Sequence, residues 1–432
     1  MTTRRTVLRL AGGIAAGAAG GGMVVASGGC RRGTDGSTRD VVPANEALVV
    51  ELAAGELAVL DAVTGQTVVN RSAAVVSGDG SRLVRSELTG GGTRITNHRI
   101  SDGSALSSGL LTDQLTARAT SPDGELVALA TLGEPGTSPY RPGGRERTTI
   151  VVAGSAGQQH RVELPGNLEP EAFDVTGQAL FVLDYLPPTA PDRYRVRVVD
   201  LVAGELQPLV TRVKSAVPPG AEEEMRGEGR QAVYDSVTRQ LFTLYTHQPD
   251  HEHTRDLIAG AREDAPHVHA FVHTLNLTER WAFCVDLPAP FGEGPAAAHA
   301  IALDPNGGAV YVVDATSGTI ATIDPSGLTV KGTVRFTPPA GPVTSAAATT
   351  GSTGVLLVGA GRDLVTVPLT GAEPTRRTMP TAVRGIAASP DRRRCFVGQD
   401  DGVLRVDLGT GVTTGPVAVP GLQTLRQVVA RS

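Results

Sequence analysis

The chain has 432 residues, of which 40% are hydrophobic, enough for a substantial core, while only 3% are aromatic. Its 53 glycines and 29 prolines suit many short strands and tight turns better than long helices. The formal net charge of −5 argues against nucleic acid or an anionic membrane surface as the main partner.

The first 29 residues have the pattern of an export signal. Segment 3–9 (TRRTVLR), with Arg4 and Arg5, resembles the twin-arginine signal, and an apolar run diluted with Gly and Ala follows it over 10–26. That run is too weakly apolar for a stable transmembrane helix. Removal of residues 1–29 would take away three positive charges and no negative one, lowering the net charge from −5 to −8. We therefore expect a signal peptide over 1–29 and an exported protein.

Cys30 ends this segment as Ala-Ser-Gly-Gly-Cys, which resembles a lipoprotein box with Ser27 where leucine is usual. The resemblance implies a lipid on Cys30 that anchors the protein to the membrane; simple cleavage and release is the alternative. Residues 31–44 are polar and are predicted to be a flexible tether. The expected location is the outer face of the cytoplasmic membrane or the cell envelope.

Residues 45–432 repeat two kinds of turn. The first is a Ser/Asp/Gly cluster, found seven times, at 77–80, 121–124, 174–177, 234–237, 304–307, 351–354 and 389–392. The second follows an apolar run that ends in Asp, as in 60–65, 199–204, 323–327 and 406–411, with weaker copies at 101–103, 154–157, 276–278 and 370–371. Asp and Ser bond their own backbone and Gly accepts positive φ, so these are predicted turns between short strands.

This spacing predicts an all-β fold, a single β-propeller of four-stranded blades. Eight units carry the second turn, so we count eight blades, with seven as the alternative. The N-terminal unit lacks the first turn and starts at Ala47–Leu52, while Leu422–Ala430 is a spare apolar strand. We therefore expect the C-terminal strand to pair with the N-terminal blade and close the ring.

The sixth unit carries a family resemblance. Its segment 311–324 (YVVDATSGTIATID) resembles the YVTN repeat, a WD40-like propeller unit of bacterial and archaeal surface proteins. The resemblance implies a propeller in an extracytoplasmic setting. It implies no reaction, since one fold serves many functions.

The largest insertion, 246–268, begins the segment that holds most of the histidines. Six of the nine lie between 247 and 273, with acidic residues among them. Residues two apart in a strand face one side, so the later ones are expected to share a face with Phe271. Imidazoles near carboxylates suit a zinc or copper site, for which the candidate ligands are His251, His253, His267, His269 and His273. The alternatives are a polar loop with incidental histidines and a pH-sensitive or acid–base role.

Two other features are expected to be structural. The Pro- and Glu-rich connection 213–230, with its run Glu222–Glu224, is predicted to be a solvated loop. Cys284 and Cys395 fall in different predicted blades and are expected to be two buried thiols, with a disulfide as the alternative.

No standard catalytic signature is present: the chain has no Gly-x-Ser-x-Gly elbow, no Walker loop and no CxxC. We therefore expect a monomeric binding or interaction scaffold, membrane-tethered, with a protein, peptide or glycan ligand. The alternatives are a propeller enzyme, either a lactonase-like hydrolase or a metal- or quinone-dependent oxidoreductase, and a structural envelope protein. Histidines that converge near the propeller axis would favour chemistry, whereas an outer position would favour binding.

Overall fold

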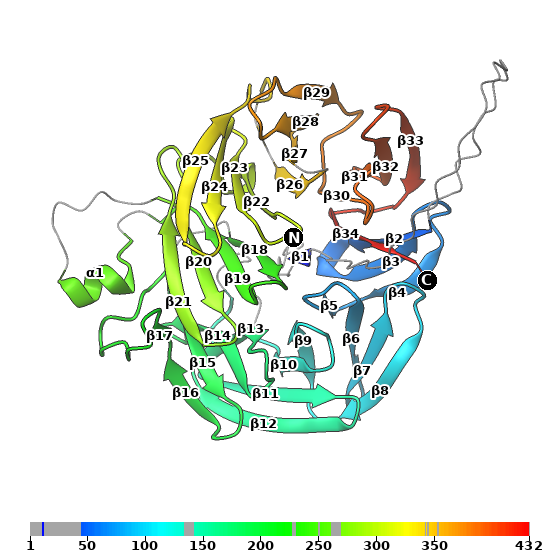
Figure 1. Cartoon of the computed structure of the whole chain (residues 1–432). Coiled ribbons are helices and arrows are strands. Elements are labelled where there is room, and N and C mark those ends of the chain that lie inside the picture. The colour runs from blue at the N-terminus through cyan, green and yellow to red at the C-terminus, as the bar shows by residue number, and fades with distance from the viewer. Residues whose placement is uncertain are drawn as a thin grey trace, which may run out of the picture.

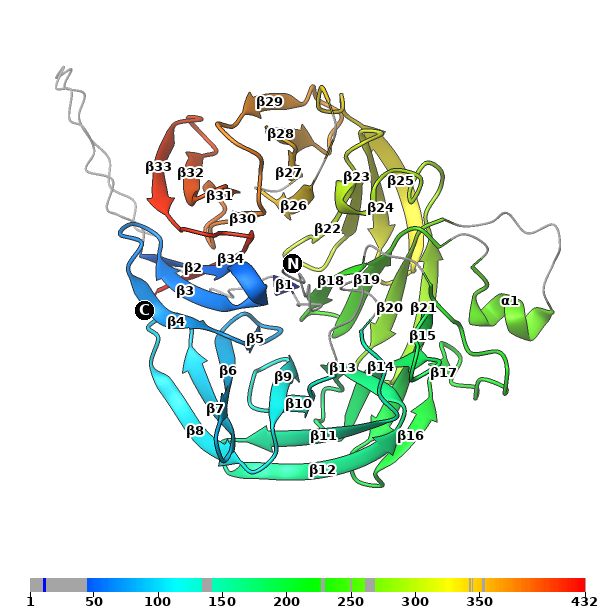
Figure 2. The same cartoon turned by 180° about the vertical axis from the view of Figure 1, so that it is seen from behind.

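The computed structural model describes residues 11–12, 45–133, 142–226, 230–248, 251–260, 269–341, 343, 345–351 and 354–431. These residues form a ring of sheets around a central axis, seen from its two sides in Figure 1 and Figure 2. Arg4, Arg5, Cys30 and the tether 31–44 lie outside the described residues. Ala11 and Gly12 are described as a two-residue strand, β1, that pairs in parallel with β18.

The eight-bladed propeller predicted from the turn count is confirmed: eight sheets carry the ring, each built on four antiparallel strands. From the axis outward, blade 1 contains β34 (Thr424–Ala430), β2 (Glu46–Glu51), β3 (Leu57–Asp61) and β4 (Thr67–Ser72), and blade 2 contains β5 (Ala74–Val76), β6 (Arg82–Thr89), β7 (Gly92–Arg99) and β8 (Ala105–Leu111). Blade 3 contains β9 (Leu115–Thr120), β10 (Val127–Thr131), β11 (Arg147–Gly154) and β12 (Gly157–Pro165), and blade 4 contains β13 (Asn167–Phe173), β14 (Ala179–Leu186), β15 (Arg193–Asp200) and β16 (Glu205–Pro208).

Blade 5 contains β18 (Arg230–Asp235), β19 (Gln240–Tyr245), β20 (Phe271–Asn276) and β21 (Trp281–Asp286), and blade 6 contains β22 (His299–Leu303), β23 (Val310–Asp314), β24 (Thr319–Asp324) and β25 (Thr329–Arg335). Blade 7 contains β26 (Ala346–Thr350), β27 (Val355–Ala360), β28 (Asp363–Pro368) and β29 (Thr375–Thr378), and blade 8 contains β30 (Ile386–Ala388), β31 (Arg394–Gln399), β32 (Gly402–Asp407) and β33 (Thr413–Ala418). The helical elements of the described chain are η1 (Ala53–Gly55), α1 (Thr254–Ala259) and η2 (Ala296–Ala298). No helix in the described part is long and apolar enough to cross a membrane.

The ring is closed by the C-terminal strand. β34 pairs antiparallel with β2, with Leu48 opposite Val428, so blade 1 contains both ends of the folded chain. This pairing confirms the expected closure. It gives β2 a hydrogen-bonded neighbour on each side, β34 and β3, so β2 is not an open sheet edge.

The two turn types work as their residues predict. Ser77 Oγ donates to Asp79 Oδ1 at 2.6 Å and accepts the backbone N–H of Arg82 at 2.9 Å, while Gly80 takes φ +72°. In the second type, Asp61 Oδ1 accepts the backbone N–H of Thr64 at 2.7 Å. Each turn is therefore stabilised by its own side chains.

Blade 5 departs from the regular pattern at its outer edge. A short strand, β17 (Val210–Thr211), comes from the connection that follows blade 4 and pairs in parallel with β21, the outermost long strand. The helix α1 lies beyond the same edge (Figure 1). Between blades 4 and 5 the core is aromatic, with Tyr185, Tyr194, Tyr245 and Phe271 in one buried cluster. This corner of the ring holds the candidate site.

Candidate functional site

The histidines of segment 247–273 separate in the structure. His251 and His253 come together, and His273 lies buried on β20 nearby. His247 turns toward His299, with 6.2 Å between the ring centroids. His269 is exposed and precedes the first residue of β20, so it does not share the strand face of Phe271 and His273. His267 lies outside the described residues.

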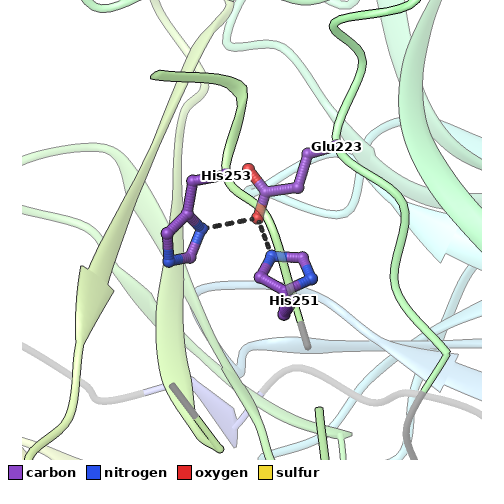
Figure 3. A group of neighbouring side chains, drawn as sticks. All are labelled: Glu223, His251 and His253. Atoms are coloured by element: carbon purple, nitrogen blue, oxygen red, sulfur yellow. Dashed lines mark hydrogen bonds and ion pairs between the residues drawn. The ribbon is translucent and has the colours of Figure 1, made fainter. Parts of the chain in front are cut away.

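Glu223 is the centre of the cluster formed by His251, His253 and Cys284, which we call the Glu223 cluster. Its Oε1 atom lies 2.8 Å from His251 Nε2 and 3.1 Å from His253 Nδ1, as Figure 3 shows. The Cys284 thiol donates to the same oxygen at 2.9 Å. Two imidazoles from one segment and a thiol from β21 thus point at one carboxylate oxygen.

The run Glu222–Glu224 is therefore not the solvated loop expected from the sequence. The Glu223 side chain is only 12% exposed, and that of Glu222 18% exposed. Glu222 is held by Arg195 Nη1 at 2.7 Å and by Arg197 Nε at 3.1 Å, both from β15 of blade 4. These ion pairs dock the connection onto blade 4, which carries the next residue, Glu223, toward blade 5.

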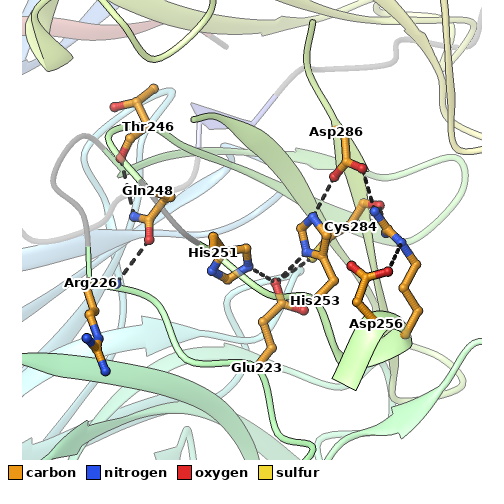
Figure 4. A network of polar contacts seen from close by, with 10 residues as sticks. Glu223, Arg226, Thr246, Gln248, His251, His253, Asp256, Cys284 and Asp286 are labelled. Carbon is orange, nitrogen blue, oxygen red and sulfur yellow. Dashed lines mark hydrogen bonds and ion pairs between the residues drawn. The ribbon is translucent and has the colours of Figure 1, made fainter. Parts of the chain in front are cut away.

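A second carboxylate fixes the other side of the His253 ring. Asp286, the last residue of β21, has Oδ1 2.5 Å from His253 Nε2, and its Oδ2 accepts a bond from Arg255 at 2.5 Å (Figure 4). Arg255 also donates to the carbonyl of Cys284 at 2.8 Å, which ties α1 to β21. His253 is thus held between Glu223 at Nδ1 and Asp286 at Nε2, which fixes the orientation of its ring.

Aromatic packing fixes the two imidazoles further. His251 stacks on Phe271, with 4.4 Å between centroids and 18° between planes, and His253 meets the same ring edge-on at 5.0 Å and 85°. Phe271 is fully buried at the start of β20 and stacks in turn on Tyr245. The site is therefore built on the rigid core between blades 4 and 5.

The electrostatics of the cluster follow from these contacts. Burial alone would raise the pKa of Glu223, but the hydrogen bonds from His251 and His253 outweigh it and hold this pKa well below its ordinary value. Burial opposes a charge on His253, but Asp286 and Glu223 together raise the pKa of His253 to about 9. Burial, reinforced by Glu223, raises the pKa of the Cys284 thiol well above its usual range.

His273 is a further buried imidazole beside the cluster. It lies opposite Cys284 in the β20–β21 register and is 3% exposed. Within the described chain its Nδ1 atom has no hydrogen-bond partner. Burial lowers the pKa of His273 to about 4, so this ring is neutral at physiological pH.

The cluster forms one wall of a cavity of about 370 Å³ at the outer edge of blade 5. His253, Cys284 and Glu223 line it, together with apolar side chains from β15, β17, β21 and α1. By topology this is the outer half of the blade, away from the inner strand β18. The histidines therefore converge, but not at the propeller axis.

A second, smaller cavity of about 130 Å³ lies among the inner strands. Among the residues that the structure describes, its lining includes Arg392 and Arg426 but no acid and no histidine. Arg426 is paired with Glu51, and Arg392 donates to the carbonyl of Thr350 at 2.8 Å. This inner cavity therefore lacks the converging acids or histidines that an enzyme site on the axis would need.

The donor chemistry of the Glu223 cluster fits a transition metal. Imidazole nitrogen, thiolate sulfur and carboxylate oxygen are the ligands of Zn²⁺, and imidazole and thiolate also suit copper. The nearest ligand atoms of Glu223, His251 and His253 all lie within 4.8 Å of one another. Asp286 on the far nitrogen of His253 is the carboxylate partner that metal-binding histidines usually have.

The sequence pointed to His251 and His253 but not to Glu223, Cys284 or Asp286. Cys395, the other described cysteine, is a separate buried thiol in blade 8, and the structure has Cys284 and Cys395 as free cysteines. The signal that could have found Cys284 is its position on a strand beside the histidine insertion. No sequence pattern around Glu223 distinguishes it as a site residue.

No family model and no curated protein matches this sequence. The resemblance of the sixth unit to the YVTN repeat therefore has no family match behind it. Solved structures similar to this chain include dihydro-heme d1 dehydrogenase NirN in complex with DHE, at 14% identity over 90% of this chain and 75% of that chain, with a TM-score of 0.45. The periplasmic gluconolactonase PpgL of Pseudomonas aeruginosa is similar at 19% identity over 88% of this chain and 98% of that chain, with a TM-score of 0.42. AztD of Citrobacter koseri is similar at 14% identity over 89% of this chain and 96% of that chain, with a TM-score of 0.38. At these identities and scores, no function of this chain follows from them.

Proposed function

We propose that this protein is an exported β-propeller that binds a transition-metal ion of the zinc class at the Glu223 cluster. The observation that carries the proposal is the convergence of His251 Nε2, His253 Nδ1 and Cys284 Sγ on one oxygen of Glu223. Without a metal, that oxygen occupies the position on which the three donors converge. A small rotation of the Glu223 carboxylate would let an ion replace it and keep Glu223 as the fourth ligand.

Binding is favoured over catalysis for two reasons. Glu223, His251 and His253 would supply three ligands, and the Cys284 thiol, which donates to the same oxygen of Glu223, would fill the fourth position that catalytic zinc keeps open. The cluster also lies on outer strands, and the inner cavity has no converging acids or histidines. Export by a twin-arginine-like signal, with or without a lipid on Cys30, would place the site outside the cytoplasm.

The test is zinc binding by the full chain, measured by equilibrium dialysis against Zn²⁺ and elemental analysis. We expect one zinc per chain, lost in His251→Gln/His253→Gln. The matched control is His160→Gln/His269→Gln, which removes two histidines outside the cluster and should keep the zinc. Unfolding curves of each variant establish that it is folded. Equal zinc content in both double variants, or none in the wild type, would contradict the proposal.

A further inference from the structure

The cavity beside the Glu223 cluster is larger than a metal ion requires. A water-sized occupant takes about 30 Å³ of space, whereas the cavity measures about 370 Å³. Pockets for small organic molecules begin at about 300 Å³. The remaining space is therefore of the size that holds an organic ligand.

Most of the cavity wall is apolar. Val196 from blade 4, Leu209 and Val217 from the inter-blade connection, Ile258 from α1 and Phe283 from β21 all line it. At this site Val213 is 83% exposed and Ile258 47% exposed, unusually high for large aliphatic side chains beside a cavity. An apolar body in contact with them would be stabilised by the apolar surface that it removes from water. The wall thus favours a ligand with a hydrocarbon body.

The charges around the cavity almost cancel. Glu222 is paired with Arg197 and Arg195, Arg195 is also paired with Asp184, and Arg255 is paired with Asp286. Glu223 is hydrogen-bonded to His251, His253 and Cys284. Each of these charged groups thus has its partners within the protein.

Arg212 is the exception. Its guanidinium lies 5.5 Å from the Phe283 centroid and 5.9 Å from that of Trp281, and it donates to the carbonyl of Ser326 at 3.1 Å. Among the described residues, no carboxylate lies within ion-pair distance of it. The cavity thus carries one uncompensated positive charge at its aromatic edge.

We propose that this cavity binds a small amphipathic monoanion, with a hydrocarbon body against the apolar wall and one carboxylate beside Arg212. The inference concerns a second ligand and does not depend on the metal, because it rests on the apolar wall and on Arg212, neither of which belongs to the Glu223 cluster. The carboxylate–guanidinium pairing supplies orientation, and the apolar wall supplies most of the affinity.

Trp281 provides the measurement, because it is the single tryptophan of the chain and lies beside Arg212. The fluorescence of the full chain is titrated with decanoate, 1-decanol and acetate, and the affinities are checked by calorimetry. We expect saturable binding of decanoate at least tenfold tighter than that of either other probe. Arg212→Gln should lower decanoate affinity to that of decanol. Ala282→Phe, which narrows the cavity, should weaken both.

The control is Arg71→Gln, which removes a 72%-exposed arginine on blade 1 and should leave decanoate affinity unchanged. Equal decanoate affinity in Arg212→Gln and wild type, or no saturable binding, would overturn the inference. Sedimentation with phosphatidylglycerol vesicles without any response to decanoate would overturn it too, in favour of a lipid surface. Zinc content is measured on the same samples, so either proposal can fail while the other stands.

Discussion

His253 Nε2 lies 2.5 Å from Oδ1 of Asp286. This contact leaves only Nδ1, on the opposite side of the ring, to face Glu223. It also joins the insertion after β19 to the end of β21, since Asp286 is held in turn by Arg255 of α1. The contact therefore orients a proposed metal ligand without being part of the donor set.

Replacing Asp286 should weaken metal binding without abolishing it. Asp286→Asn removes the charge that orients His253, and changes at such carboxylate partners typically cost 10–100-fold in metal affinity, so we expect a loss of about that size. Competition of the zinc-loaded protein with a chelator measures it. The control is Asp256→Asn, a half-exposed carboxylate 3.8 Å from the same Arg255, which should change the affinity less than threefold. Equal affinities in the two variants would rule out the orienting role.

Glu223 should stabilise the metal-free fold. In Glu223→Gln, the imidazolium of His253 loses a buried counter-ion and the cluster loses charge-assisted hydrogen bonds, so we expect the free energy of unfolding to fall by about 1–3 kcal/mol. Chemical denaturation in the presence of a chelator measures it. Glu224→Gln is the matched neighbour: its side chain is 35% exposed, and its ion pair with Arg193 is expected to contribute about 0–1 kcal/mol. A loss no larger than that of Glu224→Gln would contradict the central role of Glu223.

The fold could be predicted from the sequence because its determinants are local and repeated. Ser77, Asp79 and Gly80 make one turn by bonding each other, and the same chemistry recurs at Ser121. Each repeat marks one blade, so counting turns counts blades. The closing strand was predictable for the same reason, since one unit lacked its first turn and the chain ended in an unassigned apolar run.

The site was only half predictable because its partners are far apart in the chain. Glu223 lies 28 residues before His251 and 61 before Cys284. It reaches them only because Glu222 docks on Arg195 and Arg197 of blade 4. A run of three glutamates has the same local pattern whether it is solvated or docked. The position of β20 also had to be known, since the strand begins at Phe271 and leaves His269 exposed.

His299 should make the protein less stable in acid. The ring is fully buried, and its Nδ1 donates to the Pro295 carbonyl while Nε2 accepts the N–H of Gly292, so the neutral form satisfies both nitrogens. Burial lowers the pKa of His299 in the folded state, despite the carboxylate of Asp314 at 4.0 Å. The unfolded chain, with a pKa of about 6.5, binds the proton first. The contribution of His299 to the free energy of unfolding should therefore be fully present above about pH 6.5. Below that pH it should fall by up to about 1.4 kcal/mol per pH unit.

Urea unfolding of wild type and His299→Gln at pH 7.5 and 5.0 measures this effect. We expect the difference in unfolding free energy between the two pH values to be smaller in His299→Gln than in wild type. His160→Gln, on the outer strand of blade 3, is the control and should keep the wild-type dependence. The same pH dependence in all three proteins would show that His299 does not cause the loss of stability in acid.

Removing the closing strand should open the ring. A chain ending at Gln423 lacks β34, so β2 loses its pairing from Glu46 to Glu51, and the apolar cluster around Leu48, Phe396 and Leu425 loses one side. The exposed edge of β2 would be a template for intermolecular pairing. We expect loss of a cooperative unfolding transition and concentration-dependent association, measured by calorimetry and light scattering. A chain shortened only by Ser432 keeps β34 and should unfold as the wild type does. A monomeric, cooperatively folded chain ending at Gln423 would mean that seven complete blades and three strands of the eighth suffice to hold the ring.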